Sequence, residues 1–121
     1  MQFMLLFYNK PENQMPPTDP VAAQAYYGAW GAYMGALQAA GASINGHGLM
    51  PPHTATTLRV PGGKRQVQDG PFADSKEQLG GYFVIEVASL DEALEWAARS
   101  PTALNGAIEV RPVMTPAAPR S

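Results

Sequence analysis

Residues 69–87 read DGPFADSKEQLGGYFVIEV, and this stretch decides how the rest of the chain is arranged. Gly70 and Pro71 predict a tight turn, because glycine tolerates unusual backbone dihedral angles while proline fixes φ and lacks an N–H. The glycines at 80 and 81 are expected to break the chain before a core strand over Tyr82–Val87. Its alternation predicts one apolar face and one face with polar groups, namely Phe83, Ile85 and Val87 against Tyr82, Val84 and Glu86.

The length of 121 residues fits one domain, which we place at residues 1–114, with a flexible tail rich in proline and alanine at residues 115–121. Charged residues make up only 15% of the chain, against about 25% in typical domains. A surface so poor in charge predicts that a second subunit covers part of it. The net charge of −2 gives no electrostatic footprint for nucleic acid.

The chain has no cysteine, which excludes disulfides, thiolate metal sites and a cysteine nucleophile. The first ten residues, MQFMLLFYNK, have neither the basic start nor the cleavage site of a signal peptide. One uncharged helical segment consists mostly of Ala, Gly, Tyr and Gln, a poor composition for crossing a membrane. We therefore predict a cytoplasmic protein that binds neither membranes nor nucleic acid.

The first half of the chain predicts a strand followed by a helix. Phe3–Tyr8 is apolar on both faces, which is typical of a central strand. After a proline-rich loop, Asp19 and Pro20 form a helix start, and Gly41 follows the expected last helical residue, Ala40. Helical spacing predicts that the core stripe consists of Ala23, Tyr27, Trp30, Met34 and Leu37, and that Tyr26 and Tyr33 lie off it, available to a second subunit.

The middle of the chain predicts three short strands. Ser43–Leu49 precedes a pair of prolines, and Thr54–Val60 then alternates β-branched residues. The Pro61–Gly63 turn leads into Lys64–Gln68, so the last two strands form a hairpin. Polar residues on both sides of this hairpin indicate an edge position in the sheet.

The last third predicts a helix and a final strand. Ser89–Glu92 is a capping box, and Ser100 with Pro101 ends the helix that it starts. Ala107–Val113 is the last strand. The order is therefore β-α-β, a hairpin, then β-α-β, which predicts an α+β, ferredoxin-like βαββαβ fold with an inserted β-hairpin and helices on one sheet face. A second copy is the economical cover for the other face.

Several motifs in this order resemble the YCII-related proteins that carry the DGPF signature. They are DGPF at 69–72, KEQLGGYFVIEV at 76–87, LDEALEWAAR at 90–99, IEVRPV at 108–113 and GHGLMPPHTATTLRV at 46–60. The resemblance implies a dimeric α+β barrel of ferredoxin-like subunits, with a cleft between the two sheets. It also implies a His–Asp pair in that cleft. The first helix departs from the family pattern because it has no charge, which allows a larger interface.

The candidate catalytic residues are Asp69, His47 and His53. Imidazole is the usual proton carrier near neutral pH, and these two histidines are the only ones in the chain. The sequence does not rank one above the other. Asp69 can act as a general base or orient a ligand, but an aspartate before glycine also often bonds to its own following backbone.

The candidate binding residues border the expected cleft or its mouth: Tyr8, Phe72, Lys76, Tyr82, Glu86, Glu109 and Arg111. Each also has an ordinary structural interpretation. Glu109 can pair with Arg111 of a neighbouring subunit, Phe72 can be buried under the hairpin, and Lys76 can lie in a solvated turn. The histidine spacing matches no metal motif, and no cofactor signature is present, so we predict neither a metal nor a cofactor.

Two functions fit these patterns. The first is an enzyme that performs cofactor-independent proton transfer on a small apolar or aromatic metabolite in a cleft between two sheets. The second is a non-catalytic dimeric module that binds a small ligand or serves a regulator as an accessory. A closed cavity with an acid and a histidine within hydrogen-bond reach favours the enzyme.

Overall fold

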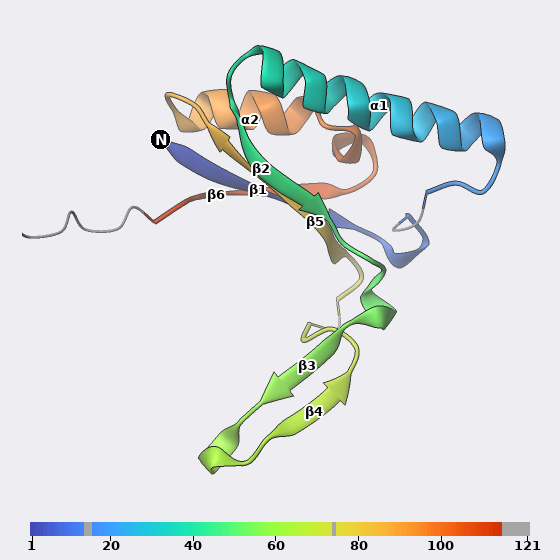
Figure 1. Ribbon diagram of the computed structural model, residues 1–121, viewed down its shortest axis with the longest axis vertical. Coiled ribbons are helices and arrows are strands. Elements are labelled where there is room, and N and C mark those ends of the chain that lie inside the picture. The colour runs from blue at the N-terminus through green and yellow to red at the C-terminus, as the bar shows by residue number, and fades with distance from the viewer. Residues whose placement is uncertain (14–15, 74, 115–121) are drawn as a thin grey trace, which may run out of the picture.

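The computed structural model describes residues 1–13, 16–73 and 75–114 (Figure 1). The predicted tail at residues 115–121 lies outside the described residues. The helices and strands follow the expected order: β1 (Gln2–Asn9), α1 (Pro20–Ala39), β2 (Ser43–Gly48), β3 (Thr56–Arg59), β4 (Gln66–Asp69), β5 (Gln78–Glu86), α2 (Leu90–Arg99) and β6 (Ala107–Pro112). Short 3-10 turns lie between them, namely η1 (Pro11–Asn13), η2 (Pro52–Thr54), η3 (Pro61–Gly63) and η4 (Pro101–Leu104).

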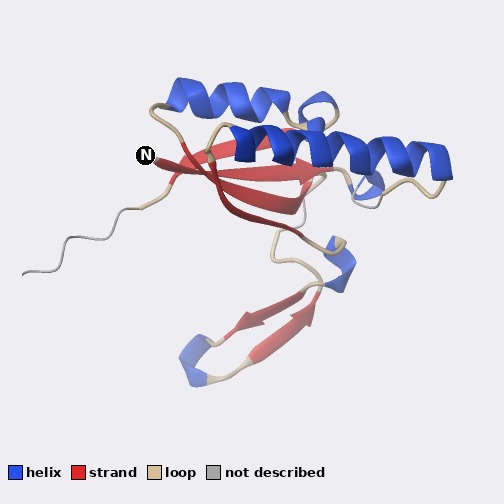
Figure 2. Ribbon diagram, turned by 45° about the horizontal axis from the view of Figure 1, so that its top comes forward, coloured by secondary structure: helices blue, strands red, loops and turns tan. Residues whose placement is uncertain are grey.

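The main sheet has four strands in the order β2-β5-β1-β6, and all neighbouring strands are antiparallel. Both helices lie on one face of this sheet, as Figure 2 shows. With β3 and β4 set aside, the arrangement is the predicted ferredoxin-like βαββαβ fold, so the α+β prediction is confirmed. Among the described residues, neither helix combines the length and the apolar character needed to cross a bilayer.

The core lies between the sheet and the two helices. β1 contributes Phe3, Leu5 and Phe7, all less than 5% exposed, and Ile85 of β5 is fully buried beside them. Strand alternation therefore directs these side chains to the helices, and leaves Met4 and Leu6 on the opposite face. We call that opposite surface the helix-free face; by register it includes Met4, Leu6, Tyr8, Asn45, His47, Tyr82, Val84, Glu109 and Arg111.

The predicted core stripe of α1 is wrong in four assignments: Tyr27 and Met34 are exposed, and Tyr26 and Tyr33 lie on the stripe instead of off it. Tyr33 is 5% exposed and donates a hydrogen bond to the carbonyl oxygen of Trp96 (2.8 Å), whereas Tyr27 is 62% and Met34 43% exposed. The stripe that packs toward the sheet instead follows the half-buried Tyr26 and Trp30 and the buried Tyr33 and Leu37. Both stripes have helical spacing and share Trp30 and Leu37. Since the helix has no charged residue to mark its outer face, the sequence could not choose between them.

Both predicted helix starts are confirmed at the level of their hydrogen bonds. The Asp19 side chain accepts from the Ala22 N–H (2.9 Å) at the start of α1. At the start of α2, Ser89 Oγ accepts from the Glu92 N–H (3.2 Å), and Glu92 Oε2 accepts from the Ala88 N–H (3.1 Å). These bonds satisfy backbone donors that a helix start leaves without partners.

The strand around residue 82 begins earlier than predicted. β5 starts at Gln78, so Gly80 and Gly81 lie inside the strand rather than breaking the chain. Gly81 faces the edge strand β2 so closely that a Cβ atom there would stand 2.9 Å from the His47 carbonyl oxygen. The glycines therefore permit a close approach of two strand backbones.

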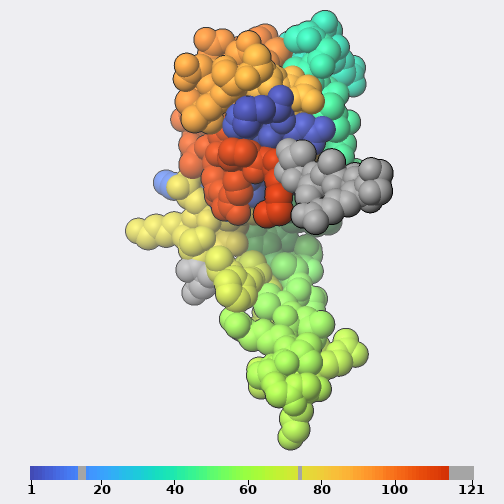
Figure 3. Space-filling view, turned by 90° about the vertical axis from the view of Figure 1, so that its left-hand side faces the viewer, coloured from blue at the N-terminus to red at the C-terminus, as the bar shows by residue number. Residues whose placement is uncertain are grey.

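The β3–β4 hairpin is not an edge of the main sheet, and this prediction is wrong. It forms a two-stranded sheet of its own, which projects away from the helices (Figures 1 and 2) and stands clear of the body in the space-filling view (Figure 3). We call residues 55–72 the arm. At its base, the Gly70 N–H donates to the Ala55 carbonyl oxygen (2.7 Å), and Gly70 adopts φ of 98°, which favours glycine.

Candidate functional site

A cavity of about 280 Å³ lies between α1 and the sheet, at the end where β2 and β5 carry their glycines. Rings from three elements form its walls: Phe7 of β1, Tyr26 and Trp30 of α1, and Phe83 of β5. Phe7 meets Trp30 and Phe83 edge to face, with ring centroids 5.4 and 5.5 Å apart. We call this space the aromatic cavity, and its walls offer flat apolar surfaces to a ligand.

Four glycines border the aromatic cavity. Gly46, Gly48, Gly80 and Gly81 come from the two adjacent strands β2 and β5. Open space lies where a Gly48 side chain would stand, whereas Gly46 and Gly81 let the Phe83 ring and the β2 backbone approach closely. Asn9, Asn13 and Thr102 add amide and hydroxyl groups to the lining, so a mostly apolar ligand would also meet a few polar contacts.

His47 and Tyr82 also border the aromatic cavity, and they form a hydrogen-bonded pair. His47 Nδ1 lies 2.9 Å from the Tyr82 hydroxyl oxygen, because the two residues are directly opposite in the β2–β5 register. Strand parity directs both side chains to the helix-free face, and β2 is an edge strand, so the imidazole is exposed at that edge. Among the sequence candidates, the structure brings these two together.

The acidic and basic candidates of the helix-free face are engaged within the chain. Arg111 Nε donates to Glu109 Oε2 (2.7 Å), so this ion pair forms inside one chain rather than requiring a neighbouring subunit. Glu86 pairs with the N-terminal ammonium group of Met1 (2.6 Å). Tyr8 lies half-buried on the same face, between Leu79 and Ala107.

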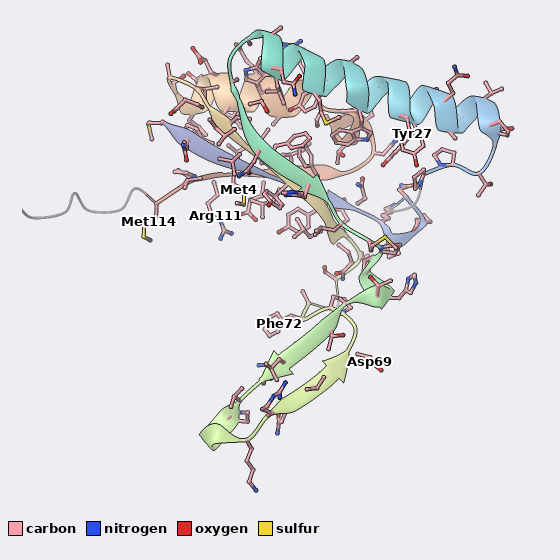
Figure 4. The ribbon with its side chains drawn as sticks, viewed as in Figure 1. Met4, Tyr27, Asp69, Phe72, Arg111 and Met114 are labelled. Atoms are coloured by element: carbon pink, nitrogen blue, oxygen red, sulfur yellow. The ribbon has the colours of Figure 1, made fainter. Side chains whose placement is uncertain are left out.

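The remaining candidates lie elsewhere. Asp69 and Phe72 are on the arm, away from Met4 and Arg111 of the sheet (Figure 4). Phe72 is 73% exposed rather than buried under the hairpin, and the Arg59 guanidinium lies 4.7 Å from its ring centroid. Asp69 therefore lies away from the main sheet, which carries His47 (Figure 4).

His53 and Lys76 occupy connecting segments. His53 lies exposed in η2, between the sheet and the arm, and Lys76 lies exposed just before β5. Across residues 1–13, 16–73 and 75–114, no three His, Asp or Glu side chains gather as a metal site would require. The structure thus offers one candidate proton-transfer group at the aromatic cavity, His47.

The cavity walls themselves were missed by sequence reasoning. Phe7, Trp30 and Phe83 were assigned to the core, and Tyr26 to a subunit contact. The available signal was the placement of four glycines on two strands beside large aromatic residues. That signal has meaning only once the register of β2 against β5 is known.

Comparisons with known proteins agree with the fold. A chain in the solved structure of 5-chloro-2-hydroxyhydroquinone dehydrochlorinase from Burkholderia phenoliruptrix, bound to 2,5-dihydroxybenzoquinone, shares 20% identity and a TM-score of 0.53 over 94% of both chains. An uncharacterized protein of Rhizobium meliloti (strain 1021) is 49% identical over 67 residues. That match covers 54% of each chain, so this chain spans about half the length of that curated relative. The family model for the YCII-related domain matches residues 1–116, and the chain therefore belongs to the YCII-related family.

Proposed function

We propose that this protein is a small-molecule enzyme that holds a planar, mostly apolar ligand in the aromatic cavity and moves a proton with His47. The proposal rests on one observation, namely that an aromatic-walled cavity and a hydrogen-bonded histidine are adjacent. A cavity of about 280 Å³ with aromatic walls is bordered by a histidine that is hydrogen-bonded to Tyr82. Histidine is the side chain best suited to proton transfer near neutral pH.

The edge position of β2 provides the route between ligand and imidazole. A ligand that fills the aromatic cavity and is longer than a single ring extends over the free edge of β2 to His47. The Tyr82 hydroxyl can donate to Nδ1 or accept from it, so the pair supports either neutral tautomer. With Nδ1 accepting, the neutral ring presents its Nε2–H as a hydrogen-bond donor. With Nδ1 donating, Nε2 is free to take a proton from the ligand as a base, and the imidazolium so formed can return it as an acid.

The ligand class follows from the walls and is supported by the structural neighbour. That protein is a dehydrochlorinase of a hydroxylated one-ring compound and was solved with 2,5-dihydroxybenzoquinone. Flat oxygenated rings of this kind stack on or meet edge to face with Phe7, Trp30 and Phe83. Proton transfer on such rings needs no bound cofactor. We also propose that the protein is cytoplasmic, because a chain without cysteine fits a reducing compartment.

A homodimer completes this proposal. The helix-free face carries Met4, Leu6, Tyr8 and Val84 at its centre, and its charged pairs lie toward its edges. A second copy placed on this face would bury the half-buried Met4, Leu6 and Tyr8 side chains and enclose the His47–Tyr82 pair between two sheets. Low surface charge supports the same arrangement.

The separation of Asp69 from His47 favours a second candidate function. Within one chain, the aspartate lies on the arm and the histidine on the main sheet. A cavity that binds a ring compound without transforming it would serve as a non-catalytic sensing or accessory module.

A titration with ring compounds separates these two functions. Trp30 borders the cavity, so its fluorescence in a Trp96→Phe background reports binding of 2,5-dihydroxybenzoquinone and of hydroquinones that carry a substituent long enough to reach His47. A time-dependent change in the ring absorbance reports turnover. His47→Gln should preserve binding and lower turnover by about a hundredfold or more, whereas His53→Gln serves as the matched control.

The possible outcomes are distinct. Equal turnover in His47→Gln and the wild-type protein rejects the catalytic role of His47. Binding without turnover of any compound in the panel identifies the binding module. No fluorescence change with any ring compound rejects the aromatic cavity as the ligand site.

A further inference from the structure

The arm is a two-stranded sheet that pairs with no strand of the main sheet. Its two strands, Thr56–Arg59 and Gln66–Asp69, pair only with each other in the described part of the chain. A single two-stranded hairpin is at best marginally stable in water, and it needs a further strand or a packed surface to hold its shape. The arm is therefore expected to meet a surface that the isolated chain does not show.

One face of the arm is apolar and uncovered. Leu58 and Val67 are opposite each other in the register and are 51% and 61% exposed. Asp69 pairs with Thr56, two residues away, and so lies on this same face. The other face is polar, with Thr57 opposite Gln68 and Arg59 opposite Gln66.

Charge distinguishes the arm from the rest of the chain. Its charged residues are Arg59, Lys64, Arg65 and Asp69, a net charge of +2. Because the whole chain carries −2, the remaining residues carry −4. Opposite net charges therefore attract the arm of one copy to the body of another at long range. At the helix-free face itself, Glu86 and Glu109 are already paired with the Met1 ammonium group and Arg111, so the docking contact is mainly apolar.

The direction of the arm agrees with that arrangement. It projects on the side of the main sheet that is opposite the helices (Figures 1 and 2). This is the side of the helix-free face, which in Figure 4 carries Met4 and Arg111. A second copy facing that surface would receive the arm, and two-fold symmetry would repeat the contact in both directions.

We propose that the arm of each copy packs its Leu58–Val67 face against the body of a second copy, so that Asp69 of one chain is contributed to the helix-free side of the other. This proposal rests on the homodimer proposed above but not on the chemistry at His47. It gives Asp69 a position beside a functional sheet that it does not reach within its own chain.

The first test removes the apolar face of the arm. Leu58→Ser with Val67→Ser should raise the dimer dissociation constant in sedimentation by about tenfold or more, since two aliphatic side chains per arm lose their burial. The control is Leu90→Ser with Leu94→Ser on α2, whose side chains are 49% and 48% exposed, and it should leave the constant unchanged. Circular dichroism verifies that the body of each variant is folded.

The second test maps the contact directly and does not depend on stability. The chain has no cysteine, so single cysteines can be introduced without background reaction. A mixture of Leu58→Cys and Met4→Cys proteins, treated with a flexible bis-maleimide, should give a covalent heterodimer. Replacing Met4→Cys by Leu90→Cys on the opposite side of the sheet should not.

Two results would overturn the inference while leaving the homodimer in place. One is a dimer whose dissociation constant changes less than twofold in the arm variant. The other is cross-linking of Leu58→Cys to Leu90→Cys as readily as to Met4→Cys. Neither result bears on ligand binding in the aromatic cavity, because that binding is measured in a separate assay by Trp30 fluorescence. A chain that stays monomeric throughout rejects both the homodimer and the arm contact.

Discussion

Phe83 of β5 packs directly over Gly46 of β2, so that a Cβ atom at position 46 would overlap the phenyl ring and stand 2.7 Å from the Tyr82 carbonyl oxygen. Phe83 is also held by Phe7 and Trp30, which meet it edge to face. This single contact links the backbone of the edge strand to the wall of the aromatic cavity. The cavity therefore depends on a residue that has no side chain.

Gly46→Ala should destabilise the protein and displace the cavity wall. The added methyl group meets backbone as well as ring, so we expect the free energy of unfolding to fall by about 1 to 3 kcal/mol. Urea denaturation measures this change. Gly35→Ala is the matched control, because nothing lies within 4 Å of a Cβ there; in a helix this change should stabilise by roughly 0.5 to 1 kcal/mol. Equal effects at both positions would contradict the packing account.

The buried Tyr33 hydroxyl should make the protein less stable at alkaline pH. Burial raises the pKa of the Tyr33 hydroxyl to about 12, and the positive charge of Arg99 opposes this only in part. Above pH 10 the unfolded chain loses this proton before the folded chain does, so the free energy of unfolding falls as the pH rises from about 10 to about 12. The full loss from this group is about 2 to 3 kcal/mol.

Tyr33→Phe tests the alkaline effect through its pH dependence. The variant should lose about 1 kcal/mol at neutral pH, because the hydrogen bond to Trp96 is removed, and should show a flatter decline above pH 10. Tyr27→Phe, at a residue 62% exposed, is the control. The explanation fails if Tyr33→Phe and the wild-type protein lose stability in parallel between pH 10 and pH 12.

Ser89→Ala should weaken the start of α2. Ser89 Oγ satisfies the Glu92 N–H, and loss of such a cap costs about 1 kcal/mol. Ser89→Asp keeps an acceptor oxygen and should retain most of the stability. Thermal unfolding followed by circular dichroism measures both variants, and an unchanged melting temperature in Ser89→Ala would show that the cap contributes nothing.

Phe72→Ala should affect assembly more than the stability of a single chain. The Phe72 ring is mostly exposed and contacts Arg59, an arrangement worth about 0.5 to 1 kcal/mol. Dilution below the dimer range, followed by urea denaturation, should therefore show a loss no larger than this. A loss of several kcal/mol in the monomer would mean that the ring is part of the core of its own chain.

Local signals in the sequence predicted the elements well. The Asp19 and Ser89 caps depend on residues within one helical turn, and the alternation in β1 depends only on successive residues. Together with the turn patterns, these signals predict the order of helices and strands. That order, with both helices on one face of the sheet, predicts the ferredoxin-like fold. The resemblance to the YCII-related family was likewise carried by linear motifs, and the family match confirms it.

The candidate site was predicted only in part. His47 and Tyr82 were both named, but their pairing needed the β2–β5 register, which joins residues 35 positions apart. The choice between two helical stripes on α1 needed the position of Trp96, whose carbonyl oxygen accepts the Tyr33 hydroxyl. The hairpin was read as a sheet edge because its polarity does not reveal the direction in which it leaves the body.

The sequence by itself determined where both helices begin, the order of the strands, which strand faces are apolar, and the family to which the chain belongs. These features depend on backbone dihedral preferences and on side-chain spacing over a few residues. Only the tertiary structure decided that glycines on two strands lie beside four aromatic rings, that His47 meets Tyr82, and that Asp69 stands on a separate arm. Each of these depends on contacts between residues far apart in the chain, and no local pattern encodes them.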